Sequence, residues 1–97
     1  MIPVKRLEIV IDAPSAERVT KLLARRGFSG WTILRNAAGA GDRGPRQDDG
    51  ITSVASNHVI VTTCPPDELD GFLEDLRALL GQVGGMCLVS DAHWLKH

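Results

Sequence analysis

A short glycine-rich segment is the first stretch whose residue types and spacing could do chemistry. It reads Gly-Ala-Gly-Asp-Arg-Gly over residues 39–44 and is followed by Arg46. Backbone amides without side chains can approach an anion closely, and Arg43 and Arg46 could add charge-assisted hydrogen bonds. No helix is expected directly after the segment and no lysine with a hydroxyl follows, so it matches neither the dinucleotide fingerprint nor the Walker motif. From these residues alone, a phosphate-binding turn and a flexible solvated loop are both open.

Two further features could support ligand binding. Gly84 and Gly85 precede a strand-like stretch, where they could form a turn that needs positive φ or a second backbone clamp on the same ligand. The two tryptophans, Trp31 and Trp94, could stack on a base, or could serve in packing or at an interface.

The remaining reactive side chains do not form a recognisable catalytic or metal-binding set. His58, His93 and His97 are scattered without metal-ligand spacing, and neither Cys64 nor Cys87 has a cysteine nearby. No nucleophile and base occur in a known motif. Two cysteines are too few for a disulfide framework, so we expect two buried thiols.

Length and charge restrict the class of protein. The chain has 97 residues, which suits one domain over 1–97, and 11 basic against 12 acidic side chains give a net charge of -1. This balance argues against general binding of nucleic acid. The chain has no apolar run of membrane-spanning length, and its N-terminus lacks the order of a signal peptide. We therefore expect a cytoplasmic protein.

Hydrophobic periodicity predicts four strands and two helices. Leu7, Ile9 and Ile11 alternate along the first strand, and leucines at intervals of three and four mark the second helix. A long loop without large apolar residues separates the second and third strands. In chain order, the expected elements are a strand over 4–11, a helix over 15–26, strands over 31–36 and 58–63, a helix that opens at the prolines 65–66 and stops at Gly81, a strand over 86–90 and a tail over 91–97.

This order predicts a ferredoxin-like α+β fold. In the βαββαβ arrangement, a four-stranded antiparallel sheet carries both helices on one face. The other face would present apolar side chains such as Val10, Ile33 or Ile60, depending on the register of the strands. An uncovered apolar face of this kind is usually an interface, so we expect an oligomer.

Several of these stretches together resemble the PII signalling proteins. The run over 27–33, Gly-Phe-Ser-Gly-Trp-Thr-Ile, followed by the glycine segment 39–44, is similar to the PII strand that leads into the long T-loop. Residues 88–91 resemble the last strand of that family, which follows its glycine-containing B-loop. Ser56-Asn57 and the tail ending 95–97 resemble the branch tied to inorganic carbon, the SbtB proteins and the carboxysome-associated PII proteins.

The resemblance implies a homotrimer with nucleotide sites in the clefts between subunits. It places a threonine near the adenine, the start of the T-loop near the phosphates, and the B-loop of a neighbouring subunit opposite. The nucleotide-binding residues it implies are Thr32, Gly39, Gly41, Asp42, Arg43, Arg46, Ser56, Gly84, Gly85 and Met86. For a small anion such as bicarbonate, it implies Gly41, Arg43 and Arg46.

Departures from the PII pattern narrow these expectations. The chain has no tyrosine, which excludes uridylylation of a T-loop tyrosine. The T-loop glutamine, the B-loop lysine and the tail arginines of the family are also missing. With fewer cations and no such glutamine, we expect ADP, AMP or cyclic AMP rather than ATP with 2-oxoglutarate.

The sequence therefore favours a regulatory binding protein over an enzyme. By resemblance, its T-loop would control a bicarbonate transporter or a carboxysome component, so that it would meet a membrane only through a partner. Two alternatives stay open, a weak nucleotide-hydrolysing enzyme and a CutA-like metal-tolerance trimer, although the poor metal-ligand spacing argues against the second.

Overall fold

The computed structural model describes residues 1–41, 44–46 and 56–97 of the chain. Short 3-10 turns at Ala13–Ser15 and Pro66–Glu68 lead into the two helices. In chain order, the elements are β1 (Ile2–Asp12), α1 (Ala16–Arg25), β2 (Thr32–Ala37), β3 (Gly39–Gly41), β4 (Gly44–Arg46), β5 (Asn57–Cys64), α2 (Leu69–Val83) and β6 (Met86–Trp94).

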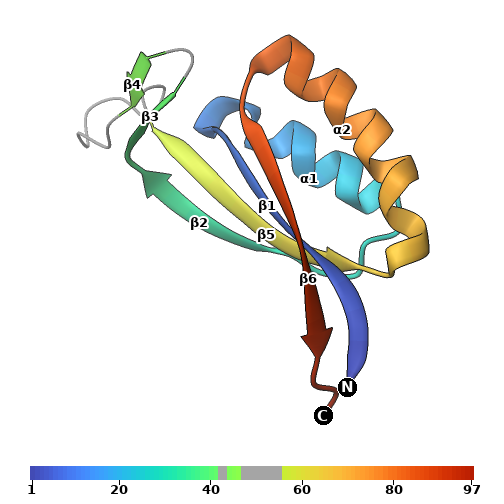
Figure 1. Cartoon of the computed structure of the whole chain (residues 1–97). Coiled ribbons are helices and arrows are strands. Elements are labelled where there is room, and N and C mark those ends of the chain that lie inside the picture. The colour runs from blue at the N-terminus through green and yellow to red at the C-terminus, as the bar shows by residue number, and fades with distance from the viewer. Residues whose placement is uncertain (42–43, 47–55) are drawn as a thin grey trace.

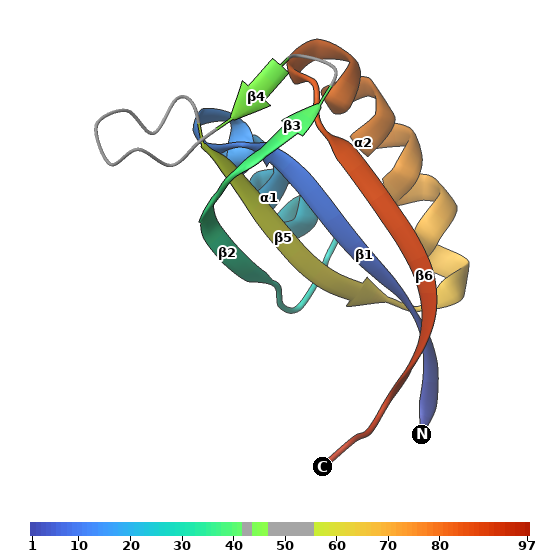
Figure 2. The same cartoon turned by 60° about the vertical axis from the view of Figure 1, so that its left-hand side comes forward.

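Four strands form one antiparallel sheet in the order β2-β5-β1-β6. Both helices cover the same face of this sheet (Figure 1). The β3–β4 hairpin lies at one end of the sheet, and both termini lie at the other (Figure 2). The prediction of a ferredoxin-like βαββαβ fold is therefore confirmed.

The core lies between the sheet and the helix layer. Leu7, Ile9 and Ile11 of β1 are almost completely buried, as their alternation predicts. Each helix buries one apolar stripe against them, Val19 and Leu23 from α1 with other residues, and Phe72 and Leu76 from α2. On the area scale, complete burial of one such side chain contributes about 1.5–3 kcal/mol, so these stripes fix the helices to one face.

The register of the strands corrects two expectations about the open face. Ile60 pairs with Ile9 across β1 and β5, and Ile33 pairs with Ile60 across β2 and β5. Residues paired directly point to the same side of a sheet, so both isoleucines face the helices with Ile9. Ile60 is fully buried, and only Val10 of the three predicted candidates lies on the open face.

The ends of α2 and β6 differ from the predicted ones. The helix continues past Gly81 to Val83, and Gly84 terminates it with φ +81° and a 2.7 Å hydrogen bond from its N–H to the Leu80 carbonyl. Positive φ, which glycine adopts readily, decides the stop. The predicted tail is also part of the sheet up to Trp94, because residues 91–94 pair with residues 2–5 of β1.

The predicted long loop contains the β3–β4 hairpin, in which Gly39 pairs with Arg46 and Gly41 with Gly44. The rest of that loop lies outside the described residues. Among the residues that the structure does describe, no helix is long and apolar enough to cross a membrane.

Candidate functional site

A cleft of about 600 Å³ lies at the end of the sheet near the termini. Separate segments of the chain build it: residues 2–4, 27–32 and 61–65, together with Glu68, Trp94 and Lys96. This volume falls in the usual range for a small-molecule site.

Both tryptophans of the chain line this cleft. Trp31 is 36% exposed and Trp94 is 46% exposed, although large aromatic side chains are usually covered. Aromatic faces stack on planar bases without a need for particular hydrogen bonds. The cleft is therefore suited to a planar aromatic ligand. It brings together Trp31 and Trp94, for which the sequence allowed either stacking on a base or packing.

The turn that carries Trp31 is fixed to the body of the protein on both sides. Phe28 packs against Phe72 with ring centroids 4.8 Å apart, which holds the turn on α2. The Thr62 hydroxyl donates a 2.7 Å hydrogen bond to the Gly30 carbonyl, which holds it on β5. Trp31 therefore extends from a backbone that is already ordered. Because the turn is held in place before binding, less conformational entropy is lost when a ligand stacks on Trp31.

The predicted nucleotide-binding residues fall into separate places. Thr32 lines the cleft, whereas Gly39 stands roughly 20 Å away, at the other end of β2. Met86 begins β6, three strand spacings or about 14 Å from β2 across the sheet. One chain therefore does not bring Thr32 and the residues 84–86 together.

The other predicted residues differ in what the structure says of them. Gly41 and Arg46 belong to the β3–β4 hairpin, and Ser56 is fully buried, with its carbonyl accepting a 3.0 Å hydrogen bond from the Ala13 N–H. Asp42 and Arg43 lie outside the described residues. A ligand role for any of them stays a prediction.

Sequence reasoning missed the parts of the cleft that come from the two ends of the chain. Residues 2–4 and Lys96 line it because β1 and β6 are neighbours, so that both termini reach the same place. The contact between the two ends was missed because residues 91–97 were predicted to be a tail rather than part of a strand. The useful signal was the presence of only two tryptophans in a chain without tyrosine.

The open face of the sheet carries an apolar row. Leu34, Val59, Val10 and Met86 are consecutive partners across the four strands. Leu34 is 55% exposed, Met86 46%, and Leu88 in the next row 53%. Exposed apolar side chains that adjoin in this way indicate an interface.

The described residues contain no group of three or more His, Cys, Asp or Glu that could hold a metal ion. Cys64 is buried, as expected, but Cys87 is only half-buried because it lies on the edge strand β6. Burial raises the pKa of the Cys64 thiol, with smaller contributions from Glu68 and Asp67, and burial raises that of Cys87 to about 11. Because the thiolate is the nucleophile, both cysteines are unreactive at neutral pH.

We expect Cys87 to make the stability of the fold pH-dependent in alkaline solution. Its pKa is higher in the folded protein than the ordinary 9.0, so its contribution is present below pH 9.0 and is lost as the pH rises toward about 11. Urea unfolding over this window should show a fall in the free energy of unfolding that is smaller in Cys87→Ala. Equal slopes in the two proteins would contradict the assignment.

This fold, with its aromatic cleft and open apolar sheet face, is that of a ferredoxin-like α+β protein with a candidate small-molecule site. The family model described as nitrogen regulatory protein P-II matches residues 4–96, and the chain belongs to that family. No curated protein matches the chain in sequence.

Solved structures support the same assignment. A structure of CPII, a nitrogen regulatory PII-like protein from Thiomonas intermedia K12 bound to ADP, AMP and bicarbonate, is 27% identical, with 95% of this chain and 88% of that chain covered at a TM-score of 0.87. A second structure of CPII, bound to ADP and bicarbonate, is 28% identical over the same shares, with a TM-score of 0.82. A PII-like protein from Thermus thermophilus, 21% identical over 94% of this chain and 88% of that chain, shares the fold with a TM-score of 0.80.

Proposed function

We propose that this protein is a regulatory, non-catalytic PII-like protein that binds an adenine nucleotide, with bicarbonate as a second ligand. The observation that carries the proposal is the cleft lined by Trp31, Trp94 and Thr32, in a chain whose fold matches CPII bound to ADP and bicarbonate. The base would stack on tryptophan within the cleft.

The site is completed by a second copy of the chain. Thr32 and the glycine pair at 84–85 lie toward opposite edges of the sheet, so one protomer supplies only half of the contacts implied by the resemblance. In a homotrimer, the cleft of one subunit would meet the residues 84–86 of its neighbour. The apolar row Leu34, Val59, Val10 and Met86, with exposed ends and half-buried valines between them, supports an assembly through the open sheet face.

The charge around the cleft supports a ligand with few phosphates. Among the described residues that line it, Lys96 is the one basic side chain, and Glu68 opposes it. Each additional phosphate needs cations or backbone amides to replace its water. ADP, AMP or cyclic AMP is therefore the proposed nucleotide rather than ATP. Bicarbonate is assigned to Gly41, Arg43 and Arg46, of which Arg43 lies outside the described residues.

The biological role proposed is control of inorganic carbon uptake or fixation in the cytoplasm. It rests on the resemblance to the SbtB and carboxysome-associated PII proteins. The T-loop over 39–51, much of which lies outside the described residues, would bind or release a bicarbonate transporter or a carboxysome component. The ligand must bind one state of the loop more tightly than the other, because equal affinity for both would shift nothing.

The experiment that tests this proposal uses the two tryptophans as reporters. Titration with ADP should change the emission excited at the red edge of tryptophan absorption, where adenine does not absorb. Stacking on an aromatic side chain contributes about 1–3 kcal/mol per base, so Trp31→Ala should weaken ADP binding by about 5- to 150-fold. Calorimetry should rank AMP, cyclic AMP and ATP, with and without bicarbonate.

Two results would decide against the proposal. If no adenine nucleotide binds to the oligomer, the sensor function is wrong. If nucleotide binds and is hydrolysed, as a phosphate-release assay would show, the alternative of a weak hydrolase is favoured. A matched control is Trp31→Phe, which keeps an aromatic face and should retain most of the affinity.

A further inference from the structure

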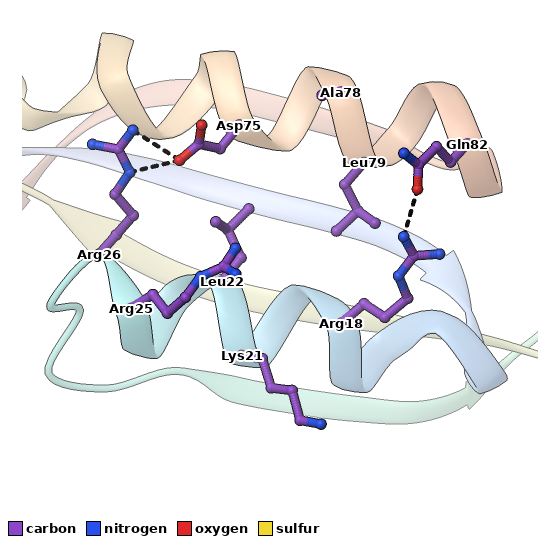
Figure 3. A pocket seen from close by; sticks show the side chains of 9 residues that line it. All are labelled: Arg18, Lys21, Leu22, Arg25, Arg26, Asp75, Ala78, Leu79 and Gln82. Carbon is purple, nitrogen blue, oxygen red and sulfur yellow. Dashed lines mark hydrogen bonds and ion pairs between the residues drawn. The ribbon is translucent and has the colours of Figure 1, made fainter.

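A second hollow of about 490 Å³ lies between α1 and α2 (Figure 3). Both helices lie on the side of the sheet opposite its open face (Figure 1). We call this hollow the helix groove. Its basic lining residues come from α1 and the residue that caps it: Arg18, Lys21, Arg25 and Arg26. Asp75 is the one acidic residue that lines the groove, so basic side chains outnumber acidic ones there although the whole chain has a net charge of -1.

Part of this positive charge is neutralised within the chain, since Lys21 forms a 3.4 Å ion pair with Glu17 and points away from α2 (Figure 3). Arg26 donates from Nε and Nη2 to Asp75, both at 2.8 Å, and from Nη2 to the Gly71 carbonyl at 2.9 Å. Arg18 donates to the side-chain carbonyl of Gln82 at 2.5 Å, which leaves its charge unbalanced. Arg25 forms no ion pair with the residues that the structure describes.

The helix groove also has an apolar floor. Figure 3 shows Arg26 and Arg18 extending toward α2 at the two ends of the groove. Leu22 and Leu79 lie between them. Leu22 is buried and Leu79 half-buried. Ala78 of α2, next to Leu79, also lines the groove.

These features select the chemistry of an occupant. A surface of arginines alone would suit any polyanion, but phosphate chains have no apolar group to place on leucines. A peptide with carboxylates and leucines can satisfy both the basic rim and the apolar floor. The net negative charge of the chain further disfavours nucleic acid.

We propose that the helix groove is a docking surface for an acidic, leucine-containing segment of a partner protein. It is separated by the whole sheet from the face that carries Leu34 and Leu88, so it stays accessible when the open faces of several copies meet. This surface is independent of the nucleotide cleft, and its failure would leave the proposed function untouched.

The probe is a fluorescein-labelled peptide of repeated Glu-Glu-Leu units, whose binding is measured by anisotropy. Arg18→Gln combined with Arg25→Gln should weaken binding about fivefold or more, because two unbalanced cations are lost. The matched control is Arg35→Gln combined with Arg77→Gln, which removes the same charge outside the groove and should change the affinity less than twofold. Binding should also weaken as salt is raised.

Competitors test the chemistry of the surface. A peptide of Glu-Glu-Ser units and inorganic tripolyphosphate should both compete less well than the Glu-Glu-Leu peptide. Equal effects of the two double variants, absence of binding, or equal competition by tripolyphosphate or duplex DNA would each overturn the proposal. A circular-dichroism spectrum and a thermal unfolding midpoint like those of the wild type would verify that the Arg18/Arg25 variant is folded.

Discussion

Replacing both Leu34 and Leu88 by aspartate is expected to convert the protein from an oligomer to a monomer of 10.5 kDa. Both leucines lie on the open sheet face and are more than half exposed in a single chain, so the chain itself should still fold. In an assembly through that face the carboxylates would be buried without partners, which costs several kcal/mol. Light scattering should give three times 10.5 kDa, or 31.5 kDa, for the wild type.

Arg77→Asp is the matched control for this variant. It changes the net charge by the same -2, but on the exposed side of α2 rather than on the sheet. It should remain an oligomer. If the double aspartate variant also kept the mass of the wild type, the open sheet face could not be the interface. If the double aspartate variant loses both the oligomer and ADP binding, this would support a site shared between subunits.

Gly85→Ala is expected to lower the free energy of unfolding by about 3 kcal/mol or more. Gly85 has φ +105°, which non-glycine residues rarely adopt, and an added Cβ would lie 2.6 Å from the Val10 carbonyl oxygen. That oxygen belongs to the backbone of β1 where β6 pairs with it, so it cannot move without disturbing the sheet. For a domain of this size, the midpoint of thermal unfolding should fall by about 12 °C or more.

Gly81→Ala, in the same region, is expected to raise the free energy of unfolding rather than lower it. Gly81 lies inside α2 and an added Cβ would meet nothing within 4 Å. Alanine should therefore stabilise the helix by about 0.5–1 kcal/mol. Both variants must be unfolded at one protein concentration, because assembly changes the apparent stability. If the two substitutions had the same effect, the conformation at Gly85 would not be the cause.

The structural demand at Gly85 bears on how the glycine pair is interpreted. Positive φ at both Gly84 and Gly85 confirms that the pair forms a turn. A clamp on the ligand of a neighbouring subunit is compatible with that turn, but the turn is sufficient to explain both glycines. Testing the clamp therefore requires nucleotide affinity to be measured in a variant that still folds, such as one at Met86.

Much of the fold could be predicted because its determinants are local. The alternation of Leu7, Ile9 and Ile11, and the three-to-four spacing of the leucines in α2, each define one buried face. With glycines and prolines at the joints, these patterns are enough for the order βαββαβ. The candidate site was harder to predict, since among the predicted nucleotide-binding residues that the structure describes, only Thr32 lies in the cleft of a single chain.

By itself the sequence determined the order and type of the two helices and the four strands of the main sheet, the buried face of β1, the glycine-rich segments and the family likeness, but not the β3–β4 hairpin. These follow from periodicity and from residues that act on their immediate neighbours. Only the tertiary structure decided that Ile33 and Ile60 face the helices, that residues 91–94 extend β6, and that Trp31 and Trp94 meet in one cleft. Each of these depends on which strands pair and in which register, and pairing between residues 2 and 94 leaves no trace in the local pattern of either segment.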